Sequence, residues 1–374
     1  MKGTTDAFLE QRHLELEAKV RAFGDQRLRP IAHDESQPAR TTRDVVSWLA
    51  GVGVLSAAVP APHGAMDLRS LVVVREALAY FSSMADTAFA MQGLGSHAVS
   101  LAGTDVQKNR WLPDVVAGSV IAAFAVTEPE AGSDLDGIRT RAEREGALWR
   151  LHGVKTFISN AGIAGLYTVL ARSSPEELSM FLVDADAPGL SVKPLEPIAP
   201  HPLGEVRFEG VPAVLLGQEG KGLRLALATL DTFRPSVGAA ACGLAARALD
   251  EALRHTQARR QFGKMLVEFQ ATQMALAEMH VELEAARLLV RHAAWTRDQG
   301  QERIAREGAA AKLYATEMAQ RVVDRAVQLH GGQGVMKGAT VERLYREVRA
   351  LRIYEGTSEI QKLVIAREIL KEKR

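Results

Sequence analysis

The sequence predicts an α+β protein, mostly helical, whose strands are gathered in the middle of the chain. Apolar residues recur at helical spacing up to about residue 122 and again from residue 217, whereas short runs bounded by turn residues fill 123–216. Hydrophobic residues make up 47% of the 374 residues and charged residues 24%, as in globular proteins with a sizeable core.

The N-terminal region is predicted to be helical throughout. Two apolar-rich stretches, 71–80 and 88–101, follow a first amphipathic helix. In that first helix, apolar residues alternate with charges at helical spacing: Leu14, Ala18, Val20 and Phe23.

The middle region changes to short β-type runs separated by turn signals such as Gly153 and Pro188-Gly189. Several such strands in succession predict an antiparallel barrel or sandwich. The predicted strands are 149–152, 167–170, 180–183, 190–192 and 206–208.

Long helices return in the last third, where apolar residues step by three and four in the pattern of a helical bundle. One such stripe runs from Leu276 to Val290 and the other from Ala311 to Leu329. Gly331-Gly332 predicts the end of the second helix, and Ser358 with Gln361 predicts a capping box at the start of the last one.

Composition and missing motifs exclude several classes of function. Forty-six basic against 45 acidic residues give a net charge of +1, which argues against nucleic acid as the main partner. The single cysteine, Cys242, excludes an internal disulfide and a cysteine-rich metal site, and the histidines lack metal-ligand spacing. Dinucleotide-binding, Walker and hydrolase motifs do not occur, and no run is long enough for a membrane helix. We expect a soluble cytoplasmic protein without a metal.

Two segments combine polar groups with open backbone. In Ala125–Asp134, Thr, Ser and Gly residues offer donors to the polar edge of a cofactor, although an ordinary helix-to-strand loop is the alternative. In Ile353–Ser358, Glu355 lies in an apolar, aromatic setting before a helix start. Burial raises the pKa of a carboxyl and makes it a stronger base, and the alternative is an acid that complements the helix dipole.

Five motifs follow one another in a fixed order along the chain. They occupy Thr127–Asp134, Lys155–Asn160, Arg259–Gln270, Gln328–Gly334 with Arg343 and Arg346, and Ile353–Gln361. Together they resemble the acyl-CoA dehydrogenase family over nearly the whole length. The resemblance implies an N-terminal all-α domain (1–122), a middle antiparallel β-barrel (123–216) and a C-terminal four-helix bundle (217–374). It also implies non-covalent FAD held without a Rossmann unit, in agreement with the missing glycine motif.

The resemblance assigns FAD contacts to matching positions. Phe157 matches an aromatic residue against the flavin ring and Ser159 a hydroxyl that faces flavin N5, whereas the N-terminus of the last helix faces the pyrophosphate–adenosine part. The expected cofactor residues are Ala125, Val126, Thr127, Gly132, Ser133, Phe157, Ile158, Ser159, Arg259, Phe262, Gln270, Gln328, Leu329, Gly331, Gly332, Thr357 and Glu359. Arg259, Phe262 and the Gln328–Gly332 stretch match residues that reach the FAD of a neighbouring subunit, which implies a homo-oligomer, in this family usually a tetramer.

Glu355 matches the catalytic base of the family. It would take the α-proton of an acyl-CoA thioester, while the β-hydrogen leaves as hydride to flavin N5. The base's own backbone N–H and a flavin hydroxyl would polarise the thioester carbonyl. The other base position known in the family is Phe233 here, which cannot accept a proton. Substrate-contacting positions are Ser133, Asp231, Arg234, Tyr354 and Gly356, and a plain salt bridge to Asp231 is the alternative role of Arg234.

The resemblance therefore predicts an oxidoreductase of fatty acid β-oxidation that forms trans-2-enoyl-CoA and passes electrons to an electron-transfer flavoprotein. An acyl-CoA oxidase-type relative that uses oxygen and a non-catalytic member of the family are the alternatives. Length and an intact Glu355-Gly356-Thr357 weigh against them. Acyl chain length, branching, physiological acceptor and the role of Cys242 do not follow from the sequence.

Overall fold

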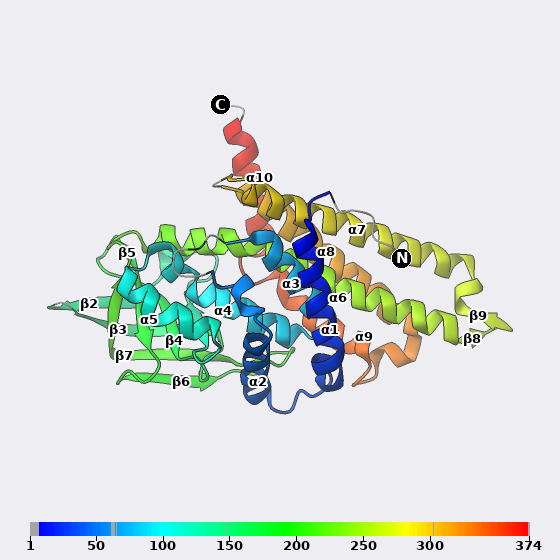
Figure 1. The fold of residues 1–374 in the computed structure, drawn as a ribbon, viewed down its shortest axis with the longest axis horizontal. Coiled ribbons are helices and arrows are strands. Elements are labelled where there is room, and N and C mark those ends of the chain that lie inside the picture. Colours follow the sequence, from blue (N-terminus) through cyan, green and yellow to red (C-terminus); the bar gives the residue numbers. More distant parts are fainter. Residues whose placement is uncertain (1–6, 61–63, 65, 147, 302, 373–374) are drawn as a thin grey trace. The chain divides into compact units, whose positions relative to one another are not determined.

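The computed structural model describes residues 7–372 apart from 61–63, 65, 147 and 302 (Figure 1). The chain divides into two compact units. Unit 1 comprises the described parts of Met1–Asp34, Asp67–Asp86 and Asp231–Arg374, and unit 2 comprises those of Glu35–Met66 and Thr87–Leu230. The first helix therefore belongs to the same unit as the C-terminal helices, although unit 2 separates them in the sequence.

Unit 1 is built from helices and one small hairpin, β8 (Arg260–Gln261) with β9 (Lys264–Met265). In Figure 1, α7 runs along α8, and α10 also packs against α8. The helices are α1 (Gln11–Phe23), α3 (Leu68–Phe81), the part of α6 (Gly222–Ala258) from Asp231 onward, α7 (Gln270–Asp298), α8 (Ala305–His330), α9 (Thr340–Val348) and α10 (Ser358–Glu372).

The two predicted apolar stripes form the core between α7 and α8. Both stripes are buried from end to end, except for Leu329, which is half-buried. Gly238 of α6 allows the third helix to approach, because a Cβ there would lie 2.8 Å from Val290 Cγ2 and 3.2 Å from the Ala311 carbonyl. The helical bundle predicted for this part of the chain is confirmed, and the predicted stop at Gly331, with φ +59°, is confirmed too.

Unit 2 holds α2 (Pro38–Gly51), α5 (Asp105–Val116) and the start of α6 up to Leu230. It also holds α4 (Ser83–Ala102) from Thr87 onward, whereas the first turn of α4, with Asp86, belongs to unit 1. A capping box starts α5: Thr104 Oγ1 accepts from the Gln107 N–H at 3.2 Å, and Gln107 Oε1 accepts from the Thr104 N–H at 2.9 Å. The five predicted strands all form, and two further strands join them. The seven strands are β1 (Ala122–Ala125), β2 (Arg141–Glu145), β3 (Leu148–Ser159), β4 (Leu166–Arg172), β5 (Leu178–Asp184), β6 (Leu190–Pro194) and β7 (Leu203–Leu216).

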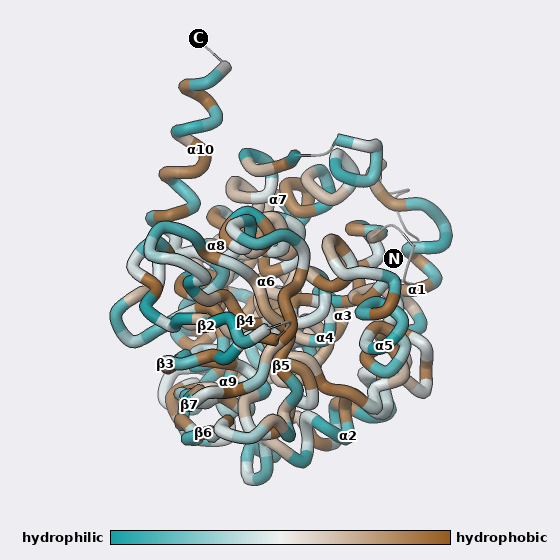
Figure 2. Tube along the Cα trace, turned by 90° about the vertical axis from the view of Figure 1, so that its left-hand side faces the viewer, coloured by the Kyte–Doolittle hydropathy of each residue, from teal (hydrophilic) through white to brown (hydrophobic). Residues whose placement is uncertain are grey.

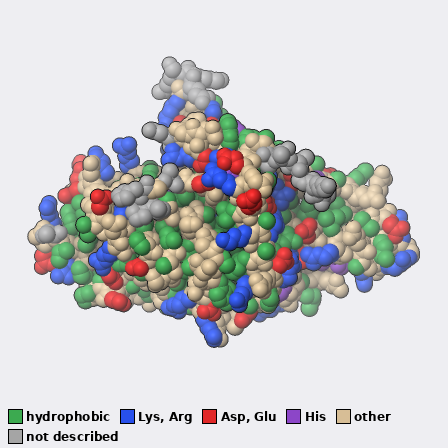
Figure 3. All heavy atoms as spheres, viewed as in Figure 1, with side chains coloured by type: hydrophobic (Ala, Val, Ile, Leu, Met, Phe, Trp, Pro, Cys, Tyr) green, Lys and Arg blue, Asp and Glu red, His purple; other side chains and the backbone are tan. Residues whose placement is uncertain are grey.

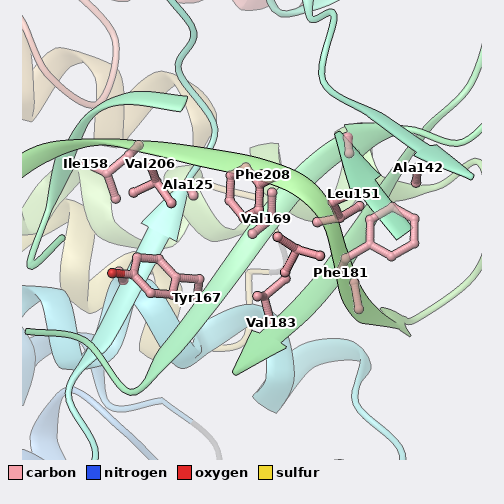
Figure 4. Close-up of a cluster of buried hydrophobic side chains, with 14 of the residues drawn as sticks. Ala125, Ala142, Leu151, Ile158, Tyr167, Val169, Phe181, Val183, Val206 and Phe208 are labelled. Atoms are coloured by element: carbon pink, nitrogen blue, oxygen red, sulfur yellow. The ribbon is translucent and has the colours of Figure 1, made fainter. Parts of the chain in front are cut away.

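The strands close into a barrel. β4 pairs with β2, β2 with β3, β3 with β7, β7 with β5, and β5 returns to β4. The pairing is antiparallel except at β4, where β1 pairs in parallel over four residues and β2 over one. Side chains from these strands fill the interior, including the labelled Leu151, Val169, Phe181 and Phe208 (Figure 4). The helix–strand–helix order is confirmed, and the domain boundaries at 122/123 and 216/217 stay a prediction.

The surface is mixed in character. Basic and acidic side chains are interspersed over the face in Figure 3, in keeping with a net charge of +1. Figure 2 shows hydrophobic and hydrophilic residues alternating along α10, where Leu363, Ile369 and Leu370 are exposed. Within the part of the chain that the structure describes, no helix is both long and apolar enough to cross a membrane.

Candidate functional site

The first candidate segment, Ala125–Asp134 in unit 2, contains a tight turn that a buried ion pair holds in place. The Glu128 N–H donates to the Ala131 carbonyl at 2.9 Å, and the Ala131 N–H donates back at 3.2 Å. Lys155 Nζ reaches the segment from β3 and donates to Glu128 Oε1 and to the Val126 carbonyl, both at 2.8 Å. The Thr140 and Arg139 N–H groups also donate to the carboxylate, so both oxygens of Glu128 accept hydrogen bonds.

The pKa values of both members of this pair lie below their usual values, for different reasons. Burial lowers the pKa of Lys155 to about 8, against the attraction of Glu128. Burial alone would raise the pKa of Glu128, but Lys155 and the hydrogen bonds to its carboxylate hold that pKa below its usual value. The ion pair therefore anchors the turn that carries Thr127 and Gly132.

A bulge in β3 explains how Phe157 is presented. The register with β7 shifts between Lys155 and Ile158, and Phe157 takes φ +56° there. Lys155 and Ile158 consequently point inward, whereas 66% of Phe157 is exposed. Figure 4 shows Ile158 and Ala125 among the barrel core, so contacts of these two residues to a cofactor would have to come from their backbone.

Ser159 lies at the end of β3 beside a histidine that the sequence did not single out. Its Oγ is 3.5 Å from Nε2 of His201, and Nδ1 of that ring is 3.0 Å from the Ala199 carbonyl. Burial lowers the pKa of His201. Thr127 is half-buried, and Gly132 and Ser133 are exposed.

In unit 1 the proposed base stands on a left-handed turn. Glu355 has φ +53° and Gly356 φ +89°. A side chain at position 356 would be strained and would meet Gln361 Nε2 at 2.7 Å from its Cβ, so glycine is required there. Glu355 is half-buried, and its Oε2 is a buried atom that makes no hydrogen bond with the described residues.

Charged groups from four helices face this carboxyl. Burial raises the pKa of Glu355, against the attraction of Arg75, Lys312 and Arg234, while Asp86 adds to the rise. Arg75 is fully buried; its Nε and Nη2 donate to the two oxygens of Asp86, both at 2.8 Å. Glu355 is therefore a poorly solvated carboxylate among buried charges, as proton abstraction requires.

The Asp231–Arg234 pair predicted on one helix turn is present in α6. Arg234 Nη1 donates to Asp231 Oδ1, and the arginine is buried. Burial raises the pKa of Asp231, against the attraction of Arg234 and Arg303. The salt bridge is thus real, and contact of either residue with substrate stays a prediction. Tyr354 is exposed and precedes the base directly.

The segments expected to reach a neighbouring subunit's FAD meet at one end of unit 1. His255 of α6 stacks on His330 of α8 with ring centroids 4.2 Å apart, so the ends of these helices lie together. Phe262 is 93% exposed at φ +52° in the hairpin that follows. The other exposed predicted residues here are Arg259, Gln270, Gln328, Gly331 and Gly332.

The last helix begins at Ser358 as predicted, but the predicted capping box between Ser358 and Gln361 is wrong. Helix α10 begins at Ser358, so Thr357 is the N-cap, and its Oγ1 accepts from the Ile360 N–H at 3.3 Å. Ser358 Oγ instead donates to Glu317 Oε1 at 2.6 Å, and Gln361 Nε2 turns back to the carbonyls of Glu355 and Gly356. The motif still places Thr357 and the exposed Glu359 at the helix start.

Sequence reasoning missed the buried polar residues that support both segments. Lys155 and Glu128 occur in the recognised motifs without an assigned role, and Arg75 and Lys312 each interrupt an apolar helical stripe. A charge within such a stripe is itself a signal, because charged side chains are seldom fully buried unless they are paired. The partner of each buried charge could be identified only from the folded structure.

Family models match nearly the whole chain. They are acyl-CoA dehydrogenase, N-terminal domain, over residues 10–119, the middle domain over 123–211 and the C-terminal domain over 220–370. The probable acyl-CoA dehydrogenase fadE25 of Mycobacterium leprae (strain TN) is 36% identical over 375 residues, covering 97% of this chain and 96% of that protein. The chain belongs to the acyl-CoA dehydrogenase family.

Solved structures of acyl-CoA dehydrogenases have the same fold. Butyryl-CoA dehydrogenase from Megasphaera elsdenii matches with a TM-score of 0.91 at 30% identity, covering 98% of this chain and 100% of that one. A glutaryl-CoA dehydrogenase from Mycobacterium smegmatis in complex with FADH2 matches with a TM-score of 0.90 at 29% identity, covering 98% and 96%. The family consists of FAD-dependent oxidoreductases, and the predicted class of enzyme and cofactor are confirmed.

Proposed function

We propose that this acyl-CoA dehydrogenase removes the α-proton and the β-hydride of an acyl-CoA thioester to form a trans-2-enoyl-CoA, with Glu355 as the base. One observation carries the proposal: Glu355 places an unpartnered buried oxygen on a left-handed turn among buried charges. A carboxylate that accepted several hydrogen bonds would be a weaker base, since each bond stabilises its charged form. The raised pKa of Glu355 makes it a better proton acceptor.

The remaining residues of the site bind and orient the substrate. Bound FAD supplies the hydride acceptor. The backbone N–H of Glu355 polarises the thioester carbonyl, so the α-proton becomes acidic enough for the carboxylate to remove. We assign substrate contacts to Ser133, Asp231, Arg234, Tyr354 and Gly356.

The described residues suit an FAD site in their chemistry. Phe157 and Phe262 are large exposed aromatic side chains on left-handed backbone, so each offers a flat apolar face on which a cofactor ring would stack. A Cβ added at Gly132, Gly331 or Gly332 would meet nothing within 4 Å, so these positions leave open space for a cofactor. We assign FAD binding to the residues predicted from the sequence, with Thr357 and Glu359 at the start of α10.

We further propose that the enzyme is a homotetramer of fatty acid β-oxidation whose electron acceptor is an electron-transfer flavoprotein. The exposed segment that contains Arg259 and Phe262 supports an oligomer, because it projects apolar and cationic groups that unit 1 does not cover.

Anaerobic titration with acyl-CoA tests the proposed reaction. The FAD-loaded protein should be bleached by at least one member of a panel of straight, branched and dicarboxylic acyl-CoA thioesters, with the matching 2-enoyl-CoA as product. Electron-transfer flavoprotein should restore the colour faster than air does. A fully loaded protein that no thioester bleaches would refute the proposed function.

Arg259→Ala is expected to weaken FAD retention by about tenfold or more, because a charge-assisted hydrogen bond to the cofactor is lost. Flavin content after dialysis measures the effect. Arg40→Ala, an exposed arginine of α2, is the matched control and should keep its flavin. Equal flavin content in the two variants would remove Arg259 from the cofactor site.

A further inference from the structure

Lys312 lies directly beneath the turn that carries the base. It belongs to α8, between the buried residues Ala311 and Ala315, and its side chain is fully buried. Its Nζ donates to the carbonyl of Tyr354 at 2.8 Å and to the carbonyl of Gly356. These two carbonyls flank Glu355, so one ammonium group holds the backbone on both sides of the base.

Gln361 holds the carbonyl between them. Its Nε2 donates to the carbonyl of Glu355 at 3.2 Å and to that of Gly356 at 2.8 Å. Three successive carbonyls of the turn are therefore directed to buried donors. This bonding supports a φ of +53° at Glu355, a conformation that is strained for a residue with a side chain.

The orientation of these carbonyls fixes the orientation of the N–H groups. In a trans peptide the C=O and the following N–H point in opposite directions. Since the Tyr354 carbonyl points to Lys312, the Glu355 N–H points away from that lysine. This N–H is the donor that the proposed reaction needs at the thioester carbonyl.

The positive charge of Lys312 also attracts the carboxylate of the base, Glu355. Arg75 and Arg234 face Glu355 as well, but each is engaged with a carboxylate, Asp86 and Asp231 respectively. Lys312 donates instead to neutral carbonyls. Burial lowers the pKa of Lys312 to about 8, and the attraction of Glu355 opposes that shift, with Arg234, Glu317 and Glu359 as the other charges that face it.

We propose that Lys312 is a positioning residue for the base: it sets the peptide that presents the Glu355 N–H and supplies a countercharge to the Glu355 carboxylate. The proposal rests on the proposed function in naming Glu355 as the base and its N–H as the donor to the thioester carbonyl. Because its side chain is fully buried, Lys312 is assigned no contact with substrate or cofactor.

Infrared titration of the enzyme without substrate tests the countercharge. The band of the protonated Glu355 carboxyl is identified as the one that Glu355→Gln removes. In Lys312→Met its midpoint should move up by about one pH unit or more, because an opposite charge at close range is lost. Lys362→Met, which removes an exposed lysine of α10, is the matched control and should leave the midpoint in place. An unchanged midpoint in Lys312→Met would overturn the countercharge.

Anaerobic bleaching tests the positioning. Lys312→Met should slow the limiting rate by about 10- to 100-fold with little change in the thioester concentration at half-saturation, since the N–H donor is misplaced while binding groups remain. Lys312→Gln keeps a donor without the charge; it should recover part of the rate but show the same infrared shift. If Lys312→Met fails to fold, Lys312→Gln takes its place in both experiments. A wild-type limiting rate in either variant would overturn the positioning role. If no thioester bleaches the wild type, the proposed function fails, and the infrared titration still decides the countercharge.

Discussion

Glu355→Gln is expected to yield a protein that keeps its FAD and binds acyl-CoA but is bleached about 10²–10⁴-fold more slowly, because glutamine matches the shape of glutamate and cannot accept the α-proton. Stopped-flow absorbance under anaerobic conditions measures the rate. In the wild type the rate should fall on the acid side as Glu355 becomes protonated. Since burial raises the pKa of this carboxyl, that acid limb should lie above pH 4.5.

A surface substitution of the same type controls for the loss of a carboxylate. Glu282→Gln removes an acid of α7 that pairs with Arg321 on the surface, and it should be bleached at the wild-type rate. Rapid bleaching of Glu355→Gln would show that another group is the base.

Lys155→Met is expected to lower the free energy of unfolding by about 3–5 kcal/mol, because it leaves the carboxylate of Glu128 buried without its partner. The loss should also loosen the turn at Thr127–Gly132, which this pair anchors. Urea unfolding with saturating FAD in every sample measures the stability, and flavin content after dialysis reports on the turn.

The double variant Lys155→Met with Glu128→Gln separates the loss of the pair from the cost of one stranded charge. It should be more stable than Lys155→Met alone, because neither charge then remains unpaired. Arg141→Met, which breaks an exposed pair with Glu143, should leave the unfolding midpoint unchanged. If Lys155→Met has the same urea unfolding midpoint as the wild type, the pair does not anchor this part of the barrel.

Periodicity was enough to predict the long helices α7 and α8 and five of the seven strands of the barrel. The two it missed show its limits. β2 is Arg141–Glu145, a charged segment that becomes a strand only because β3 pairs with all five of its residues. β1 is four residues long and its side chains are mostly buried, which gives no alternation to detect.

The candidate site was likewise predictable from the sequence only in part. Short motifs located Glu355, Phe157 and the turn at 127–132, because each motif is local in sequence. The supporting contacts are not local: Lys155 lies 27 residues from Glu128 and Lys312 lies 42 residues from Tyr354. Such pairs arise from strand register and helix packing, which a single sequence does not specify at the level of one side chain.

The discontinuity of unit 1 has a consequence for biosynthesis. Helices α1 and α3 leave the ribosome before the segment Asp231–Arg374, which completes their compact unit. At about 5–20 residues per second, the interval between Asp86 and the last helix is roughly 15–60 s. During that time the face of α3 that packs against α7 lacks its final partner. Nascent chains are therefore expected to need chaperones most before α7 and α8 emerge, and a chain truncated at residue 230 should be retained by them.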